Sequence, residues 1–349
     1  MMDVRAYASP AANAPLAPFT ITRRELGPDD ITIDIKFAGI CHSDIHQGRE
    51  EWGQGIFPMV PGHEIAGVVS AVGSNVTKFK LGDHAGVGCF VDSCRECANC
   101  KSGNDHYCLG HSTATYNGME KDLVTPTYGG YSTHIVIDEN YALHIPENLN
   151  LAEAAPLLCA GITTYSPLNR WKVGPGTRVG VVGLGGLGHM GVKLAHAMGA
   201  EVTLISHSPT KEEDALRLGA DHFLLSTDRE AWKNSTYSLD FLLNTVSVNL
   251  NVDRYLGLLG LYGTMCMVGV PTDPLSIQSA SLLSSQKSLA GSGIGSIRET
   301  QEMLDFCGEH KLGSDVEVIA VQQVNEAWDR VVASDVRYRF VIDIESLNS

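Results

Sequence analysis

Residues 178–206, RVGVVGLGGLGHMGVKLAHAMGAEVTLIS, decide the fold of the central part of the chain. An apolar run leads into a glycine motif of the form G-x-G-x-x-G, and a helix-like segment and a second apolar run follow it. In such a unit, backbone amides at the helix N-terminus bind the pyrophosphate of a dinucleotide. A tight packing turn is the alternative interpretation. The motif consists of Gly183, Leu184, Gly185, Gly186, Leu187 and Gly188.

The rest of this central region repeats the same texture. Apolar runs at residues 223–225, 241–243 and 264–268 alternate with helix-like segments. Strands that are apolar along their whole length are buried on both faces, which predicts a parallel sheet covered by helices on each side.

The regions that flank the centre differ from it. The first half reads as short strands broken by glycine and proline turns, and the tail holds two helix-like and two strand-like segments. A chain of 349 residues suits about two domains. We therefore expect an α/β protein with a β-rich domain over residues 1–156, a doubly wound nucleotide-binding domain over 157–296, and a return to the first domain over 297–349.

The end of the second apolar run predicts which dinucleotide is bound. In NAD-binding proteins a carboxylate about 20 residues after the glycines bonds the ribose 2′-hydroxyl. No acid stands at the end of this run, and the polar groups present there suit a 2′-phosphate, so we expect NADP in preference to NAD. A solvated surface loop is the alternative. The residues concerned are Ser206, His207, Ser208 and Lys211.

Four cysteines with the spacing C-x2-C-x2-C-x7-C indicate a metal site within a lobe at about residues 89–112. Thiolates this close together converge on one tetrahedral zinc ion, whereas two disulfides or a chance cluster are the alternatives. Four protein ligands leave no position for water or substrate, so this zinc ion is expected to be structural. The cysteines are Cys94, Cys97, Cys100 and Cys108.

Composition limits the possible partners. A formal net charge of −15 without any cluster of Lys and Arg argues against nucleic acid, so a small-molecule substrate is expected. No apolar run is long enough to span a bilayer, and the N-terminus lacks the pattern of a secretory signal. We therefore expect no membrane partner and a cytoplasmic location.

A second set of metal-binding residue types is spread along the chain. Cys41 and the pair His63-Glu64 precede the four cysteines, and Cys159 follows them. Two thiolates and an imidazole would hold zinc with one position open, which is the ligand pattern of catalytic zinc. Spacing alone does not join these residues, because each of them also suits a buried structural role.

Several motifs together resemble one enzyme family. The stretch from Gly62 to Glu64, followed by Gly67, Gly73 and Val76, resembles the signature of zinc alcohol dehydrogenases in the medium-chain dehydrogenase/reductase superfamily. The segments 39–44 and 335–340, the cysteine lobe and the glycine motif resemble its cinnamyl alcohol dehydrogenase branch, which includes bacterial NADP-dependent broad-range aldehyde reductases. The resemblance runs from about residue 31 to 344. It implies a GroES-like catalytic domain beside a Rossmann domain.

The resemblance also implies roles for individual residues. Cys41, His63 and Cys159 would bind catalytic zinc, with Glu64 near enough to enter the coordination sphere, so that two zinc ions are expected per chain. Ser43 would pass the alcohol proton towards the cofactor ribose and His46. Residues lining the substrate pocket would be Trp52, Cys89, Ala114 and Ile294, and further NADP contacts would be Ser43, Thr163, Thr245, Gly269, Ser292, Gly293 and Ile294.

The expected function is reversible hydride transfer between NADPH and aliphatic or aromatic aldehydes. Relatives specialised for cinnamyl substrates carry a large aromatic where Ala114 stands, which favours a wider and less selective pocket here. An NAD-linked polyol dehydrogenase of the same superfamily, a zinc-free quinone reductase and a non-catalytic zinc- and dinucleotide-binding redox sensor are the alternatives. The family also implies a homodimer, and we expect the strand near residues 264–270 to pair with its copy.

Overall fold

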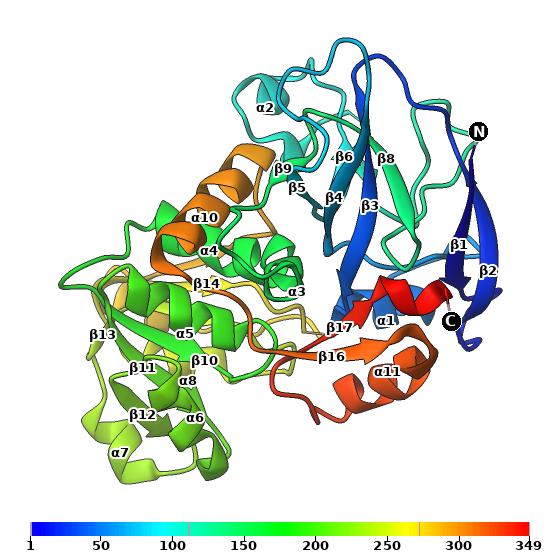
Figure 1. Ribbon diagram of the computed structural model, residues 1–349. Helices are drawn as coiled ribbons and strands as arrows, with labels where there is room; N and C mark the ends of the chain where they lie inside the picture. The colour runs from blue at the N-terminus through cyan, green and yellow to red at the C-terminus, as the bar shows by residue number, and fades with distance from the viewer. Residues whose placement is uncertain (1, 111, 272, 349) are drawn as a thin grey trace. The chain divides into compact units, whose positions relative to one another are not determined.

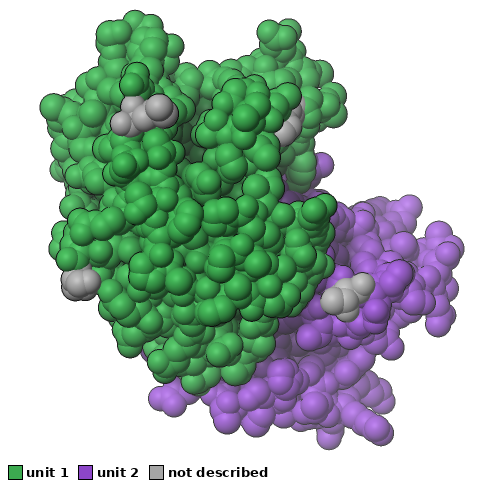
Figure 2. Space-filling view, turned by 90° about the vertical axis from the view of Figure 1, so that its right-hand side faces the viewer, with its two compact units in different colours: residues 1–159, 295–349 green, residues 160–294 purple. Residues whose placement is uncertain are grey.

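The computed structural model describes residues 2–110, 112–271 and 273–348. The chain forms two compact units, which Figure 2 shows in different colours. The first unit contains residues 1–159 and 295–349, and the second contains residues 160–294. The chain therefore leaves the first unit once and returns to it.

A seven-stranded sheet is the framework of the first unit in the described part of the chain (Figure 1). Neighbouring strands in this sheet are antiparallel, except for the two strands of the tail, at residues 316–320 and 339–343, which are parallel to each other. In spatial order the strands are β16 (Val316–Ala320), β17 (Arg339–Asp343), β3 (Asp30–Gly39), β4 (Ile65–Val72), β5 (His84–Val87) and β9 (Leu143–His144), and β8 (His134–Asp138) also pairs with β3.

Strand β3 ties the two ends of the chain together. Ile31, Ile33 and Ile35 alternate along it and are all buried. The beginning of β3 pairs with β8, and its end pairs with β17 through the register Val341 to Gly39. The last strand of the chain is thereby built into the sheet that carries the first functional residues.

Smaller elements complete the first unit. The strands are β1 (Met2–Ala8), β2 (Ala17–Arg23), β6 (Phe90–Asp92) and β7 (Thr113–Ala114). The helices are α1 (His42–Gly48), α2 (Ala98–Lys101), α3 (Leu151–Ala154), α10 (Ile297–His310) and α11 (Val324–Val332), and the 3-10 turns are η1 (Asp105–Tyr107), η2 (Ala155–Leu158), η4 (Val321–Gln323) and η5 (Ile344–Asn348).

The long helix α10 has clear local causes. Ser296 and Glu299 form a capping box at its start, which satisfies two backbone amides that would otherwise lack partners. Met303 and Cys307, one turn apart, are fully buried. Lys311, in the left-handed conformation with φ 53°, ends the helix.

The second unit is built on six parallel strands within the described residues. In spatial order they are β12 (His222–Leu225), β11 (Glu201–Ser206), β10 (Arg178–Val182), β13 (Leu239–Asn244), β14 (Leu259–Met267) and β15 (Ser288–Gly291). Chain order reverses between β10 and β13, and ligands of such sheets bind at the carboxyl ends of the strands at this switch point.

Helices cover both faces of this sheet. On one face Gly191 of α5 lies against Val181 and Leu243. On the other face Leu242 belongs to a buried cluster with Leu256 of α8. The predicted doubly covered parallel sheet is confirmed. The helices are α4 (Ala160–Arg170), α5 (Gly188–Ala197), α6 (Glu212–Arg217), α7 (Arg229–Asn234), α8 (Val252–Leu256) and α9 (Ser279–Leu283), and the 3-10 turn is η3 (Pro209–Lys211).

One expectation about this sheet is wrong. The strand near residues 264–270 was expected to pair with its copy in a second chain, but β14 already has β13 on one side and β15 on the other. Its backbone groups therefore have no free edge over this length, and the outer strand is β15.

Among the described residues, no helix combines the length and the apolar character that crossing a membrane requires.

Candidate active site and metal centres

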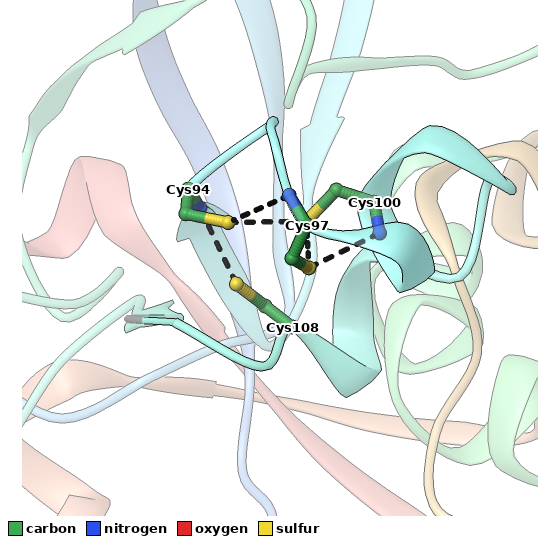
Figure 3. A group of neighbouring side chains, drawn as sticks. All are labelled: Cys94, Cys97, Cys100 and Cys108. Atoms are coloured by element: carbon green, nitrogen blue, oxygen red, sulfur yellow. Dashed lines mark hydrogen bonds between the residues drawn. The ribbon is translucent and has the colours of Figure 1, made fainter.

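Four cysteine side chains point towards one another in the segment between β6 and β7, as Figure 3 shows. The Sγ atoms of Cys94, Cys97, Cys100 and Cys108 all lie within 4.8 Å of one another, and that of Cys100 lies 3.8 Å from Cys94 and 3.4 Å from Cys97. Zinc–sulfur bonds of about 2.3 Å in a tetrahedron separate the sulfurs by about 3.8 Å. The four thiols form no disulfide and fit a structural zinc ion.

Backbone amides favour the thiolate form in this cluster. The Sγ atom of Cys97 accepts hydrogen bonds from the amides of Cys100, at 3.5 Å, and Leu109, at 3.4 Å. These two donors lower the pKa of Cys97 to about 6. A thiolate is the form that binds zinc, so the local backbone prepares the cluster for the metal.

The second cluster joins residues that the sequence keeps far apart. Cys41 stands before α1, His63 and Glu64 precede β4, and Cys159 follows η2. One ligand atom from each of the four lies within 4.8 Å of the others, and the two Sγ atoms are 3.8 Å apart. All four residues are buried. The Sγ atom of Cys41 also lies 3.4 Å from the Oγ atom of Ser43.

His63 is oriented as a metal ligand. Its Nε2 atom is buried and has no hydrogen-bond partner among the described residues, while its Nδ1 atom lies 3.6 Å from the carboxylate of Asp44. A metal-binding histidine characteristically faces a carboxylate with its second nitrogen. An imidazole nitrogen left without a partner beside two thiols, Cys41 and Cys159, fits zinc.

Glu64 is held by a cation that sequence reasoning did not assign. Its Oε1 atom forms an ion pair with Arg339 of β17, and its Oε2 atom has no hydrogen-bond partner among the described residues. Burial raises the pKa of Glu64 to about 8, against the opposing effect of the guanidinium. Arg339 belongs to a motif quoted from the sequence, but only the fold brings it to Glu64.

His46 is enclosed by aromatic rings and an acid. Its ring stacks on His42 at 4.7 Å and on Trp52 at 4.6 Å, measured between centroids. Its Nδ1 atom contacts the carboxylate of Glu51. This contact directs the other ring nitrogen away from the acid and defines the ring orientation. Glu51 could not be recognised from the sequence, because an acid in a surface loop is ordinary.

Two residues expected in the substrate pocket, Cys89 and Ala114, lie in the first unit. Cys89 is half-buried, with its Sγ atom 3.9 Å from the carbonyl oxygen of Leu158, next to Cys159. Ala114 is exposed and pairs with Phe90 in β7 and β6.

The glycine motif forms the turn between β10 and α5. Gly183, with φ 90°, makes the turn after β10 and would place a Cβ atom 2.3 Å from Val246. Gly188 opens α5 and would place a Cβ atom 2.0 Å from the carbonyl oxygen of Gly183. Between them, a Cβ atom on Gly185 would project into open space. The three positions thus serve the turn, the helix packing and the close approach of a ligand to the backbone.

The polar segment expected at the ribose follows the end of β11. Ser206 ends β11, its Oγ atom accepts from the amide of Ser208, and His207 is exposed. Lys211 follows in η3. The nearby acid Glu201 begins β11, at the other end of the strand, and contacts His222. The remaining expected cofactor contacts of the second unit are Thr163 in α4, Thr245 after β13, Gly269 after β14, and Ser292, Gly293 and Ile294 after β15.

These features define a class of protein. Residues 27–147 match the family model of the alcohol dehydrogenase GroES-like domain, and residues 186–309 match that of the zinc-binding dehydrogenases. The chain belongs to the zinc-binding alcohol dehydrogenase family, and it is an oxidoreductase with a GroES-like and a Rossmann-type part.

Individual relatives narrow the comparison. NADP-dependent alcohol dehydrogenase C 1 of Mycolicibacterium smegmatis is 57% identical over 100% of both chains. Aldehyde reductase YahK of Escherichia coli is 51% identical over 99% of both chains. A cinnamyl alcohol dehydrogenase from Sorghum bicolor has a solved structure with a TM-score of 0.95, 45% identity and 98% coverage of each chain.

Proposed function

We propose that this protein is an NADP(H)-dependent alcohol dehydrogenase and aldehyde reductase of broad range, with one catalytic and one structural zinc ion. The convergence of Cys41, His63 and Cys159 carries the proposal, because three buried ligands leave a coordination position for a substrate oxygen. The full-length similarity to an NADP-dependent alcohol dehydrogenase and an aldehyde reductase supports it.

When bound, zinc polarises the carbonyl oxygen of the aldehyde, and NADPH supplies the hydride to its carbon. The chain holds the metal with Cys41, His63 and Cys159, and Asp44 fixes the His63 ring. Glu64 lies next to these ligands, and its Oε2 atom has no hydrogen-bond partner among the described residues. Glu64 is therefore able to bind the metal in place of another ligand.

A proton path completes the chemistry. The hydroxyl of Ser43 lies beside the Cys41 sulfur and takes the proton of the alcohol during oxidation. His46 would be the next acceptor of this proton, and the carboxylate of Glu51 holds its ring at Nδ1. Because Glu51 is partly exposed, the path ends at solvent.

The second unit supplies the cofactor site. Backbone amides around Gly185 and at the start of α5 bind the pyrophosphate. The hydroxyls of Ser206 and Ser208, together with His207 and Lys211, bind the 2′-phosphate, since no carboxylate among them repels it. The preference for NADP follows from this set.

Substrate breadth follows from Ala114. A methyl group at this position removes bulk that an aromatic side chain would supply, and the exposed Trp52 offers a flat apolar surface for aromatic and aliphatic aldehydes. We accordingly propose a substrate range wider than cinnamyl aldehydes.

The deciding experiment measures turnover of an aldehyde and alcohol panel with NADPH and NADH, together with the zinc content. We expect two zinc ions per chain, turnover of both aromatic and aliphatic aldehydes, and preference for NADPH. Preference for NADH with polyols would favour the NAD-linked polyol dehydrogenase. Zinc and dinucleotide binding without any turnover would favour the redox sensor.

We also propose that the protein is a cytoplasmic homodimer. The outer strand β15 leaves one row of backbone groups unpaired in the described sheet, and a second copy related by two-fold symmetry would pair with it. Light scattering on the eluting protein gives the mass, and a monomer at micromolar concentration would contradict the dimer.

A further inference from the structure

A buried tyrosine donates a hydrogen bond to Asp44, the carboxylate that lies beside the Cys41 cluster. Tyr131 is fully buried, and its hydroxyl lies 3.2 Å from the Oδ2 atom of Asp44. Burial raises the pKa of Tyr131 well above its usual value, so the hydroxyl keeps its proton and acts as the donor. Its ring also packs against Gly62, where a Cβ atom would come within 2.7 Å of it.

Asp44 connects this contact to two of the three ligand-bearing segments. Its carboxylate accepts from the amide of Cys41 at 2.8 Å and from the amide of Gly62 at 3.1 Å, and it faces the Nδ1 atom of His63. One carboxylate thus joins the start of α1 to the segment before β4. Among the described residues, the Tyr131 hydroxyl is one of two that hydrogen-bond this carboxylate, the other being that of Tyr116.

The cysteine lobe contains a comparable chain. The hydroxyl of Ser93 lies 3.2 Å from the Sγ atom of Cys100 and 2.7 Å from the hydroxyl of Tyr141. A zinc-bound thiolate has no proton to give, so Ser93 donates to the sulfur and accepts from Tyr141. The ring of Tyr141 is fixed in turn by the Arg95 guanidinium, 4.9 Å from its centroid.

We propose that Tyr131 and Tyr141 are positioning residues, each for one metal centre: Tyr131 orients His63 and Cys41 through Asp44, and Tyr141 orients Cys100 through Ser93. This inference rests on the proposed binding of two zinc ions. Hydrogen bonds around a ligand hold it in one orientation and change metal affinity by about 10- to 100-fold when they are removed.

These two series of hydrogen bonds, one at each metal centre, allow a reciprocal experiment. In the holoenzyme, Tyr131→Phe and Tyr141→Phe each remove one hydroxyl and keep the buried ring. Zinc release into a chromogenic chelator is followed together with the loss of activity, which identifies the phase that belongs to the Cys41 cluster. We expect Tyr131→Phe to accelerate that phase by about tenfold and leave the other unchanged, and Tyr141→Phe to do the reverse.

A spectroscopic readout separates positioning from general loosening. With cobalt in place of zinc, the thiolate-to-metal and ligand-field bands report ligand geometry at each centre. Tyr131→Phe should shift the bands of the exchangeable catalytic cobalt, whereas Tyr141→Phe should leave them as in the unchanged protein. Ser93→Ala should reproduce the release kinetics of Tyr141→Phe, because it breaks the same chain.

Release phases that both variants accelerate equally, or cobalt spectra that neither changes, would overturn the proposal. A protein without two zinc ions before any substitution would instead reject the proposed function on which it rests. The metal content and the cobalt spectra are read without turnover, and activity serves only to assign the two release phases.

Discussion

Arg339 and Glu64 form an ion pair in the interior of the first unit, although 275 residues separate them in the chain. The exposed fraction of the arginine side chain is 6%, and that of the carboxylate is 0%. The guanidinium also donates to the carbonyl oxygen of Ile40 at 2.9 Å, immediately before Cys41. The tail of the chain thus reaches two of the three segments that carry ligands of the second metal cluster.

Loss of this cation should be costly. In Arg339→Met the buried carboxylate of Glu64 keeps its desolvation cost without its partner, so we expect the free energy of unfolding to fall by about 3 to 5 kcal/mol. Chemical denaturation measures this change. The double variant with Glu64→Gln removes the unpaired charge and should recover part of the loss. A double variant no more stable than Arg339→Met would contradict the explanation.

Loss of one cysteine ligand should have different effects at the two metal centres. Cys159→Ala should abolish turnover and reduce the zinc content from two ions to one, with the fold largely intact, because it removes a ligand of the catalytic ion. Cys97→Ala should lower stability or solubility, because it opens the structural cluster. Cys307→Ala, in a buried thiol of α10, is the matched control and should keep both ions. Metal analysis and circular dichroism decide the matter, and full turnover by Cys159→Ala would refute its role as a ligand.

The proton path predicts slower alcohol oxidation at constant metal content. Ser43→Ala should reduce kcat by about 100-fold, since a positioned proton acceptor contributes about that much. Glu51→Gln should have a smaller effect of the same kind, because it weakens the support of His46 without removing the imidazole. Pre-steady-state hydride transfer is the measurement, with zinc content as the control. Unchanged rates in Ser43→Ala would dismiss the path.

Cofactor preference should respond to one carboxylate. Ser206→Asp places a negative charge at the end of β11, where it repels a 2′-phosphate and accepts from a 2′-hydroxyl. We expect the ratio of kcat/KM for NADPH to that for NADH to fall by at least about tenfold, mainly through KM. Thr236→Asp, at an exposed position before β13 and hence at the opposite ends of the parallel strands, is a control for added charge. Equal effects of both changes would place the phosphate elsewhere.

The ion pair of Asp240 with Arg178 predicts a small pH effect. The side-chain hydrogen bond from Arg178 lowers the pKa of Asp240. The stability it contributes is therefore present above the usual carboxylate pKa and is lost as the pH falls through the lowered value. Because both side chains are about 40% exposed, we expect less than about 1 kcal/mol. Chemical denaturation at neutral and at acidic pH gives the free energy of unfolding of Asp240→Asn and of the unchanged protein. A stability difference between the two proteins that is the same at both pH values would contradict the effect.

Local signals made much of the fold predictable. The apolar runs expected at 223–225, 241–243 and 264–268 fall on strands β12, β13 and β14, because short apolar runs between helix-like segments form buried strands. The hairpin of β1 and β2 escaped prediction because its second strand is largely exposed and lacks an apolar pattern. Strand β15 escaped prediction for the same reason. Without β15, the strand at 264–270 was wrongly expected to be the one that pairs with a second copy of the chain.

The site shows the same division between local and distant information. The four cysteines of the lobe could be grouped from spacing alone, because one short segment supplies them all. Cys41, His63 and Cys159 could be grouped only by resemblance, since long-range folding brings them together. Tyr131, Glu51 and their contacts gave no sequence signal, because a tyrosine or an acid is common in any globular chain.

The sheet of the first unit imposes an order on metal acquisition during synthesis. The cysteine lobe can close around zinc as soon as its own segment leaves the ribosome. The pocket of Cys41, in contrast, stays unfinished until β17 delivers its guanidinium and completes the edge of β3, which happens only as the last residues emerge. A ribosome-bound chain whose final strand is still inside the exit tunnel should therefore hold one zinc ion firmly and acquire the second only after release.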